Sequence, residues 1–451
     1  MNKFSQAFWV ANTVELLERA AYYGVFIVIT LYLSRVLGFS DVQAGFIGAF
    51  FSAGLYLLPL FSGALADKIG FRNAMLLAFA LLTAGYVGLG LLPTFLSSAG
   101  LVSYSDSVEG RTEFHGLIEH PARWSIVPIM MLIMLGGSFI KSVISGTVAR
   151  ETTTDTRAKG FAIFYMMVNI GAFTGKTVVE PLRKSMGDTG LVVLNYFSAT
   201  AVFLAFLLIL MMYKSQKNEG EGKSMSEVWR GLVKVLSNGR LLALIIIISG
   251  FWLVQGQMYT TMPKYVLRMA GEGAAPGWYA NVNPLIVVLC VNFVTHIMRK
   301  RKAISSMLVG MCILPFSAFL MATGNLMSAE TILGLHPVAF MMIVGIALQG
   351  LAETFISPRY LEYFSLQAPA GEEGLYLGFS HLHSFFSWIV AFVVSGFLLD
   401  TFCPEPNKFA SHEAWAAAAQ NAHYIWFIFV GIALIAIPAL FIFSKISEKR
   451  E

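Results

Sequence analysis

The chain has 451 residues, of which 57% are hydrophobic and 13% are charged, and its formal net charge is +5. With a mean hydropathy of +0.69, it is too apolar for a soluble protein of this length, which predicts an all-α polytopic membrane protein in a lipid bilayer. Positive residues on such a protein mainly report its topology, so the net charge gives no reason to expect a nucleic-acid partner.

Charged residues interrupt the first apolar run of the chain. Glu15, Glu18, Arg19 and Tyr22 share one face at helical spacing, and Glu15 and Arg19 are four residues apart, close enough to pair. A charge at the centre of a membrane helix costs roughly 2.5 to 3.5 kcal/mol, so this face is expected to point into a wet interior. A purely structural ion pair is the alternative, but a second acid together with Tyr22 and Tyr23 favours a functional site.

The apolar runs predict twelve spans, because a spanning helix needs about 20 mainly apolar residues. Clusters of Lys and Arg recur on one side of these spans, which by the positive-inside rule places both termini in the cytoplasm. The expected spans are 8–37, 43–66, 72–96, 125–149, 158–181, 190–213, 241–268, 279–298, 303–325, 336–358, 374–401 and 421–444.

A charged connection divides the spans into two groups of six. It predicts an N-terminal six-helix bundle at 1–213, a cytoplasmic linker at 214–240 and a C-terminal six-helix bundle at 241–451. Two pseudo-symmetric bundles with substrate bound near the midplane are typical of secondary transporters. The long polar stretch 97–124 is expected outside the cell, and its sequence leaves open whether it is functional or disordered.

Five motifs carry a resemblance to a known family. They are Glu-Leu-Leu-Glu-Arg-Ala-Ala-Tyr-Tyr-Gly at 15–24, Gly-Ala-Leu-Ala-Asp-Lys-Ile-Gly-Phe-Arg at 63–72, Gly-Gly-Ser-Phe-Ile-Lys at 136–141, Phe-Tyr-Met-Met-Val-Asn-Ile-Gly at 164–171 and Glu-Thr-Phe-Ile-Ser-Pro at 353–358. The second resembles the loop between helices 2 and 3 throughout the major facilitator superfamily. The others resemble signatures of its proton-coupled oligopeptide transporters, which implies the major facilitator fold.

Two lone charges in apolar runs point to the substrate. Lys141 should neutralise an acid or contact an anionic substrate group, because an unpaired ammonium there would be costly. Glu353 is the only acid in the apolar body of the second half, and the resemblance implies that it receives the amino terminus of a peptide. Opposite charges facing one cavity would suit a zwitterion with separated termini.

The resemblance implies a wider set of site residues. Packing roles are the alternative for Tyr56, Asn169 and His381. The proton-coupling candidates are Glu15, Glu18, Arg19, Lys141 and Glu353, and the substrate-binding candidates are Tyr22, Tyr23, Tyr56, Lys141, Asn169, Trp252, Gln255, Glu353 and His381.

Two positions depart from the family pattern. Gly256 stands where the family usually carries a glutamate of helix 7, and Phe26 stands where an arginine of helix 1 often contacts substrate. Both departures leave proton coupling open. They keep a second hypothesis in view, a major facilitator transporter of a non-peptide solute such as an organic anion, sugar conjugate or siderophore, with or without proton coupling, or an exporter.

The sequence therefore predicts a secondary active transporter that imports small peptides or peptide-like zwitterions with protons, by alternating access of two bundles. No enzyme, metal site or cofactor is expected, since Gly-Lys-Thr at 175–177 lacks the earlier glycine of a phosphate loop and His-Glu at 412–413 lacks a second histidine at metal-site spacing. The expected state is a monomer in the cytoplasmic membrane. A non-transporting membrane receptor or enzyme is a third and weaker hypothesis.

Overall fold

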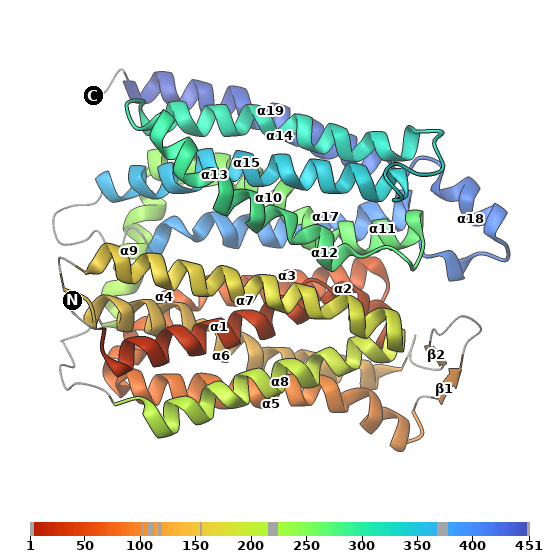
Figure 1. The fold of residues 1–451 in the computed structure, drawn as a ribbon, viewed down its shortest axis with the longest axis horizontal. Coiled ribbons are helices and arrows are strands. Elements are labelled where there is room, and N and C mark those ends of the chain that lie inside the picture. Colours follow the sequence, from red (N-terminus) through yellow and green to blue (C-terminus); the bar gives the residue numbers. More distant parts are fainter. Residues whose placement is uncertain are drawn as a thin grey trace. The chain divides into compact units, whose positions relative to one another are not determined.

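The computed structural model describes residues 4–101, 103–106, 112–115, 120–153, 156–214, 224–367 and 378–448. These residues are almost entirely helical, as the composition predicts (Figure 1). Among them, ten helices are long and apolar enough to cross a membrane, and two bent helix pairs raise the number to twelve if each pair counts as one span. This agrees with the twelve spans expected from the sequence.

Contacts between residues divide the chain into two units. Unit 1 comprises Met1–Phe39 and Phe50–Trp229, and unit 2 comprises Ser40–Ala49 and Arg230–Glu451. The three boundaries fall just before the helix α3 (Asp41–Leu57), within α3, and within the helix α9 (Met225–Ser237). The six-helix bundles expected at 1–213 and 241–451 remain a prediction.

Unit 1 is built from long helices that run side by side (Figure 1). Helix α1 packs against α7 and α8, and α5 packs against α6 and α8. Its elements are α1 (Gln6–Phe26), α2 (Ile29–Leu31), the π-helical turn Tyr32–Val36, the second half of α3 (Asp41–Leu57), α4 (Pro59–Ile69), α5 (Phe71–Ser98), β1 (Ser103–Asp106), β2 (Thr112–His115), the 3-10 turn Pro121–Ser125, α6 (Ile126–Arg150), α7 (Arg157–Met186) and α8 (Asp188–Met212).

Unit 2 has α14 between α15 and α19, while α10 packs against α17 and α19. Its elements are the first turns of α3, α10 (Gly239–Thr260), α11 (Met262–Ala270), α12 (Pro276–Ala280), α13 (Val282–Met298), α14 (Ala303–Thr323), the 3-10 turn Gly324–Leu326, α15 (Pro337–Leu366), α17 (Leu382–Phe402), the 3-10 turn Pro406–Lys408, α18 (His412–Ala419) and α19 (Tyr424–Glu448). Helix α9 (Met225–Ser237) contributes residues to both units.

Prolines explain two breaks that the apolar pattern did not predict. The second expected span is bent by 41° between α3 and α4, where Pro59 is the first residue of α4. The seventh ends its first helix at Thr260, and Pro263 follows at the start of α11. Proline lacks the N–H that would continue the helical hydrogen bonds, but it is tolerated in a first turn. Pro358, in contrast, lies inside α15, so the helix continues beyond the span expected at 336–358.

The long polar stretch 97–124 contains the antiparallel strands β1 and β2, with Ser103 opposite His115 and Asp106 opposite Thr112. The sequence alone did not predict these strands. Helix α5 extends to Ser98 before them, which shortens the irregular part of the stretch.

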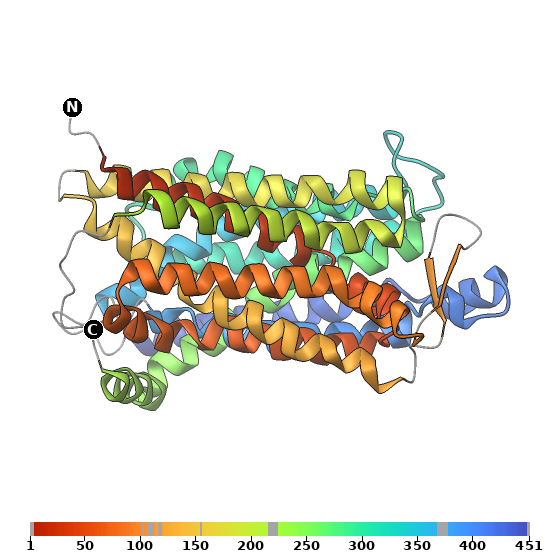
Figure 2. The ribbon, with the colours of Figure 1, turned by 90° about the horizontal axis from the view of Figure 1, so that it is seen from below.

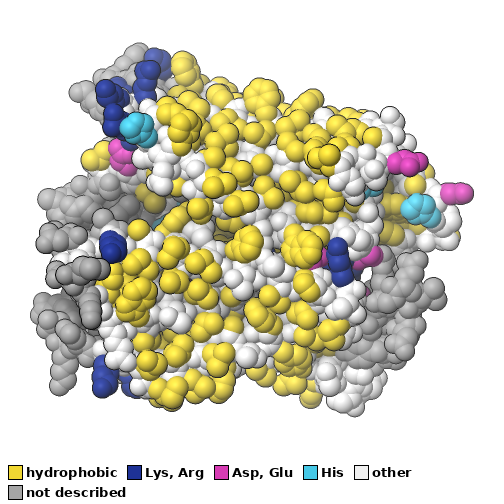
Figure 3. Space-filling model, in the orientation of Figure 1, with side chains coloured by type: hydrophobic (Ala, Val, Ile, Leu, Met, Phe, Trp, Pro, Cys, Tyr) yellow, Lys and Arg dark blue, Asp and Glu magenta, His cyan; other side chains and the backbone are white. Residues whose placement is uncertain are grey.

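The surfaces of the helices match a lipid environment. On unit 2, hydrophobic side chains cover the face of α14 and α19 that is drawn in Figure 3. Large side chains of α14 and α19 are exposed, including Phe316 at 66% and Ile435 at 72%. An apolar surface of this kind is unfavourable in water, and it fits helices that face acyl chains.

Candidate functional site

The charged face predicted on the first helix is present in unit 1. Arg19 lies between two acids of its own helix α1, with its Nε 3.3 Å from Glu15 Oε1 and 2.5 Å from Glu18 Oε2. The three residues are 3%, 2% and 8% exposed for Glu15, Glu18 and Arg19. The predicted pairing of Glu15 with Arg19 is confirmed, and Glu18 joins it.

Aromatic side chains continue this face of α1. The Arg19 guanidinium lies 5.3 Å from the centroid of the Tyr22 ring, and Tyr22 stacks on Phe26 with ring centroids 4.8 Å apart. Tyr22 and Phe26 also line an apolar cavity of about 10 Å³ with residues of α3, α5 and α6. This volume holds no more than about one water molecule, so a substrate side chain could enter only after the wall had moved.

Helix α7 approaches α1 closely. A Cβ at Gly171 would lie 2.5 Å from the carbonyl oxygen of Leu16 and 2.8 Å from Arg19 Cβ, so only a residue without a side chain fits here. On the same helix the ammonium of Lys176, a buried residue, lies 5.5 Å from the Tyr23 ring centroid. Glu180 Oε2 accepts a hydrogen bond from the Nη2 of Arg183 at 2.9 Å. The sequence analysis did not predict this ion pair.

Three further site candidates, Asn169, Tyr56 and Lys141, also lie in unit 1. Asn169 donates from Nδ2 to the carbonyl of Tyr165 in its own helix at 2.7 Å, which agrees with the local role left open for it. Tyr56 is half-buried on α3. Lys141 lies within α6, but its side chain, like that of Asp67, is outside the described residues.

In unit 2, Glu353 of α15 is the centre of an amide cluster. Its Oε2 accepts from Gln255 Nε2 at 2.5 Å and from Asn283 Nδ2 at 3.3 Å. Gln255 comes from α10 and Asn283 from α13, so three helices meet at this carboxylate. The sequence analysis singled out Gln255 and Glu353 but missed Asn283, whose signal was a polar amide next to a proline in an apolar run.

A further amide, Gln349, lies one turn before Glu353 on α15. Gln349 is fully buried, and neither its Nε2 nor its Oε1 has a hydrogen-bond partner among the described residues. A buried polar atom that makes no hydrogen bond costs about 1 to 3 kcal/mol. Gln349 is therefore ready to bind a polar group or a water molecule.

The two histidines near the start of α17 differ in burial. His383 is buried between aromatic rings, 5.3 Å from Trp252 and 5.1 Å from Tyr360 between centroids. His381, the residue selected from the sequence, is exposed, and its ring lies 6.1 Å from that of His383. Because two residues along a helix point in different directions, the sequence could not tell which one faces Trp252.

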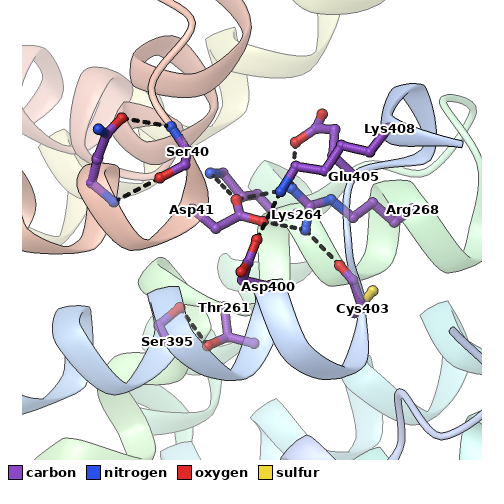
Figure 4. A network of polar contacts seen from close by, with 11 residues as sticks. Ser40, Asp41, Thr261, Lys264, Arg268, Ser395, Asp400, Cys403, Glu405 and Lys408 are labelled. Carbon is purple, nitrogen blue, oxygen red and sulfur yellow. Dashed lines mark hydrogen bonds and ion pairs between the residues drawn. The ribbon is translucent and has the colours of Figure 1, made fainter. Parts of the chain in front are cut away.

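Unit 2 contains a further charged cluster that the sequence analysis did not identify (Figure 4). Asp41, the first residue of α3, accepts from Lys264 Nζ at 2.6 Å and from both terminal nitrogens of Arg268 at 2.8 and 2.9 Å. Arg268 also donates to Glu405 at 2.5 Å and to the carbonyl oxygen of Cys403 at 2.6 Å. These four charged residues, Asp41, Lys264, Arg268 and Glu405, are called the four-charge cluster below.

Cys403 reports on the surroundings of that cluster. It is 0% exposed, and burial raises the pKa of its thiol to about 12, although the neighbouring Arg268 acts in the opposite direction. The thiol therefore stays protonated at neutral pH. The three cysteines are free in the structure.

A family model described as the Major Facilitator Superfamily matches residues 11–329, which is well over half of the chain. The chain belongs to the Major Facilitator Superfamily. This agrees with the predicted fold and with the expectation of a transporter rather than an enzyme.

Several curated relatives of this superfamily member are named as peptide permeases. It is 27% identical over 221 residues to the "Dipeptide and tripeptide permease A" of Pectobacterium carotovorum subsp. carotovorum (strain PC1), which covers 47% of this chain and 37% of the permease. Alignments with the corresponding proteins of three further bacteria cover 48% to 53% of their length. The chain thus spans about half or less of the curated permeases that it matches.

Solved structures extend the likeness of fold to the whole chain. The POT family transporter PepTSo has a TM-score of 0.73 at 18% identity and covers 100% of both chains. A POT family transporter in complex with 5-aminolevulinic acid has a TM-score of 0.72 at 18% identity, covering 98% of this chain and 96% of that one. The predicted resemblance is therefore matched at the level of fold by the kind of transporter that it named.

Proposed function

We propose that this protein is a divergent proton-coupled oligopeptide transporter that imports small peptides or peptide-like zwitterions. The observation that carries the proposal is the buried network of Glu15, Glu18 and Arg19 on a membrane-spanning helix. Two acids around one arginine give these three residues a net charge of −1. Because a buried charge is costly, uptake of a proton or contact with a cation is favourable there.

The network would couple protons to substrate by exchange of partners. Protonation of an acid weakens its hold on Arg19, so the guanidinium becomes available to a substrate carboxylate. Lys141 of α6 is proposed to share this carboxylate. Desolvation raises the pKa of a carboxyl group and a neighbouring cation lowers it, so a change of exposure during alternating access can load and release the proton.

Glu353 is proposed to bind the amino group of the substrate. The amides of Gln255 and Asn283 orient its Oε2, and amide donors leave the carboxylate its negative charge. Gln349 could add a hydrogen bond to a peptide group one turn away. Trp252, with His383 against it, and the tyrosines Tyr22, Tyr23 and Tyr56 are proposed as walls of the pocket. His381 is proposed as a substrate-binding residue at the edge of this pocket.

The relatives support this substrate class. The curated permeases are named for dipeptides and tripeptides, and one structure of the same fold contains 5-aminolevulinic acid. That compound carries an amino group and a carboxylate at opposite ends, which is the pattern that Glu353 and the α1 network would bind. The non-peptide alternative remains a possible result of the experiment below.

Coupling would proceed without an acid at the usual position of helix 7. Gly256 packs against α17, where a Cβ would lie 3.5 Å from Ala391 Cβ and 3.6 Å from a ring carbon of Trp388. These are ordinary contact distances with little room for a longer side chain. We therefore assign proton transfer to the α1 acids and Glu353, with protons as the coupling ion and no cofactor.

The proposed setting is the cytoplasmic membrane with both termini inside, since basic residues recur on one side of the spans. A monomer is proposed as the transporting state. A single chain contains both the α1 network and the Glu353 cluster, so one copy holds all the site residues named here.

The test is uptake of labelled Ala-Ala into proteoliposomes with and without an inward proton gradient. We expect gradient-driven accumulation by the wild type, loss of that accumulation in Glu353→Gln, and wild-type behaviour of Glu413→Gln, an exposed acid on α18. Accumulation without a gradient effect would reject proton coupling. No uptake of any labelled dipeptide would favour the non-peptide alternative, which a thermal-shift screen of organic anions, sugar conjugates and siderophores would then address.

A further inference from the structure

Helix α9 (Met225–Ser237) lies in the stretch expected from its charges to be a polar linker. Its first turn is held by a reciprocal pair of hydrogen bonds: Ser224 N donates to Glu227 Oε2 at 2.6 Å, and Glu227 N donates to Ser224 Oγ at 3.3 Å. This is a capping box, which satisfies two of the N–H groups that a helix start leaves open. The sequence therefore specifies a helix at this place.

The helix has an apolar surface much wider than its buried side. Val228, Leu232 and Val235 are buried at 5%, 5% and 0% exposure. A neighbouring strip, Met225, Trp229 and Val233, has the same spacing of four residues and is exposed at 42%, 57% and 47%. On a helical projection the strip adjoins the buried side, so the apolar surface continues from the protein onto an uncovered face.

The basic side chains of α9 are on the other side of this strip. Arg230 and Lys234 are exposed and lie four residues apart, so they share one face. That face adjoins the apolar strip on the side away from the buried residues. A helix of this composition, with a tryptophan at the boundary, is typical of segments that lie in the plane of a membrane interface.

The position of α9 in the chain places it at a bilayer surface. Asn238 alone separates it from α10, and its side chain caps α10 by accepting from the N–H groups of Arg240 and Leu241 at 3.1 and 3.3 Å. Since α10 is a candidate membrane span, α9 ends where that span begins. In Figure 1 α9 runs across the direction of α10, and in Figure 2 it is seen close to end-on.

We propose that α9 is an in-plane membrane anchor that binds the cytoplasmic surface of the bilayer through anionic lipid headgroups. Met225, Trp229 and Val233 insert at the level of the upper acyl chains. Arg230 and Lys234 contact the negative headgroups. The occupant of the exposed strip is therefore lipid, and the anchor does not depend on which solute the protein transports.

The experiment measures the depth of Trp229 in the intact protein. Wild type and Trp229→Phe are reconstituted into nanodiscs whose lipids carry bromine either high on the acyl chain or near its end. The difference between their emission spectra isolates Trp229 from the other tryptophans. We expect quenching of this difference emission by at least about twofold with the shallow bromines, and weaker quenching with the deep ones.

The role of the basic side chains is tested with two matched double variants. Arg230→Ser with Lys234→Ser removes the cations of α9, and Arg299→Ser with Lys300→Ser removes two exposed cations that follow α13. We expect anionic lipid to increase the quenching in the wild type and in the second variant, but not in the first. Moving the reporter one turn along the strip, with Val233→Trp in the Trp229→Phe background, should preserve the depth.

Two results would overturn the proposal. If both reporters are insensitive to bromine at either depth, lipid does not cover the strip, and a protein segment does. If the quenching is the same in anionic and zwitterionic membranes for all variants, Arg230 and Lys234 do not bind headgroups.

Discussion

The α1 network of unit 1 and the four-charge cluster of unit 2 both bury charged side chains in an apolar protein. They differ in the number of acids and bases and in the elements that supply them. The α1 network takes Glu15, Glu18 and Arg19 from five consecutive positions of one helix. The four-charge cluster joins the start of α3, α11 and the segment after α17, with two acids against two bases. The first has an excess of acid, and the second is balanced.

We interpret that difference as one between the proposed transport site and a structural ion-pair cluster. A balanced cluster with a bidentate Arg268–Asp41 pair is at its most stable when nothing changes its charge. A network with one acid in excess gains from a proton or a positive partner. We therefore expect substitutions in the four-charge cluster to act mainly on stability, and substitutions in the α1 network to act mainly on transport.

The largest expected effect is on stability, from Asp41→Ala. The substitution leaves Lys264 and Arg268 buried opposite each other without their shared acid, and breaking a buried pair in this way costs about 3 to 5 kcal/mol. Thermal unfolding in detergent should show a clear fall in Tm. The control is Asp400→Ala, which removes the exposed partner of Lys408 and should cost no more than about 1 kcal/mol. An equal fall in Tm for the two variants would contradict a stabilising role of the four-charge cluster.

Second in size is the effect of Glu15→Gln on transport. The change leaves Arg19 paired with Glu18 and removes the excess acid, so unfolding should be nearly unchanged. Proton-driven uptake should fall by about tenfold, equivalent to about 1.4 kcal/mol, while exchange of substrate without a gradient persists. Intact proton-driven uptake in both Glu15→Gln and Lys141→Ala would remove this network from the mechanism.

An effect of similar size is expected from Gly171→Ala, which tests how α7 positions Arg19. The new methyl would meet Leu16 O and Arg19 Cβ, and overpacking of this kind costs about 1 to 3 kcal/mol. Uptake should fall together with stability. Gly431→Ala in α19 is the matched control, since nothing lies within 4 Å of the added Cβ, and it should be neutral or slightly stabilising. A tolerated Gly171→Ala would mean that α1 and α7 can separate at no cost.

The smallest expected effect concerns the rate at which the Cys403 thiol reacts with maleimide. With a pKa of about 12, about one thiol in ten thousand is ionised at pH 8, and only the thiolate reacts readily. Maleimide should therefore label Cys403 only slowly in the folded protein and readily after unfolding in SDS, as peptide mass spectrometry would show. Asp41→Asn should speed the labelling of Cys403, because the charge of Asp41 raises the pKa of this thiol. Rapid labelling in the wild type would contradict the closed cluster.

The sequence was most informative where partners are neighbours along one helix. Glu15 and Arg19 pair as predicted because helical spacing alone brings them together, and Gly171 marks close packing because only a residue without a side chain fits there. The four-charge cluster was missed because Asp41 and Lys264 are more than two hundred residues apart. The choice between His381 and His383 also needed the fold, since it depends on which way each residue of a helix turns.

By itself, the sequence determined an apolar helical chain with twelve possible spans, a charged face on α1 and a lone acid, Glu353, in an apolar run of the second half. These features depend on local composition and on the helical period, which operate within a few turns. Only the tertiary structure decided that Asn283 and Gln255 meet at Glu353, that Asp41 joins Lys264 and Arg268, and that α9 leaves an apolar strip uncovered. Such contacts depend on how distant segments pack, because burial and desolvation are set by neighbours in space rather than in sequence.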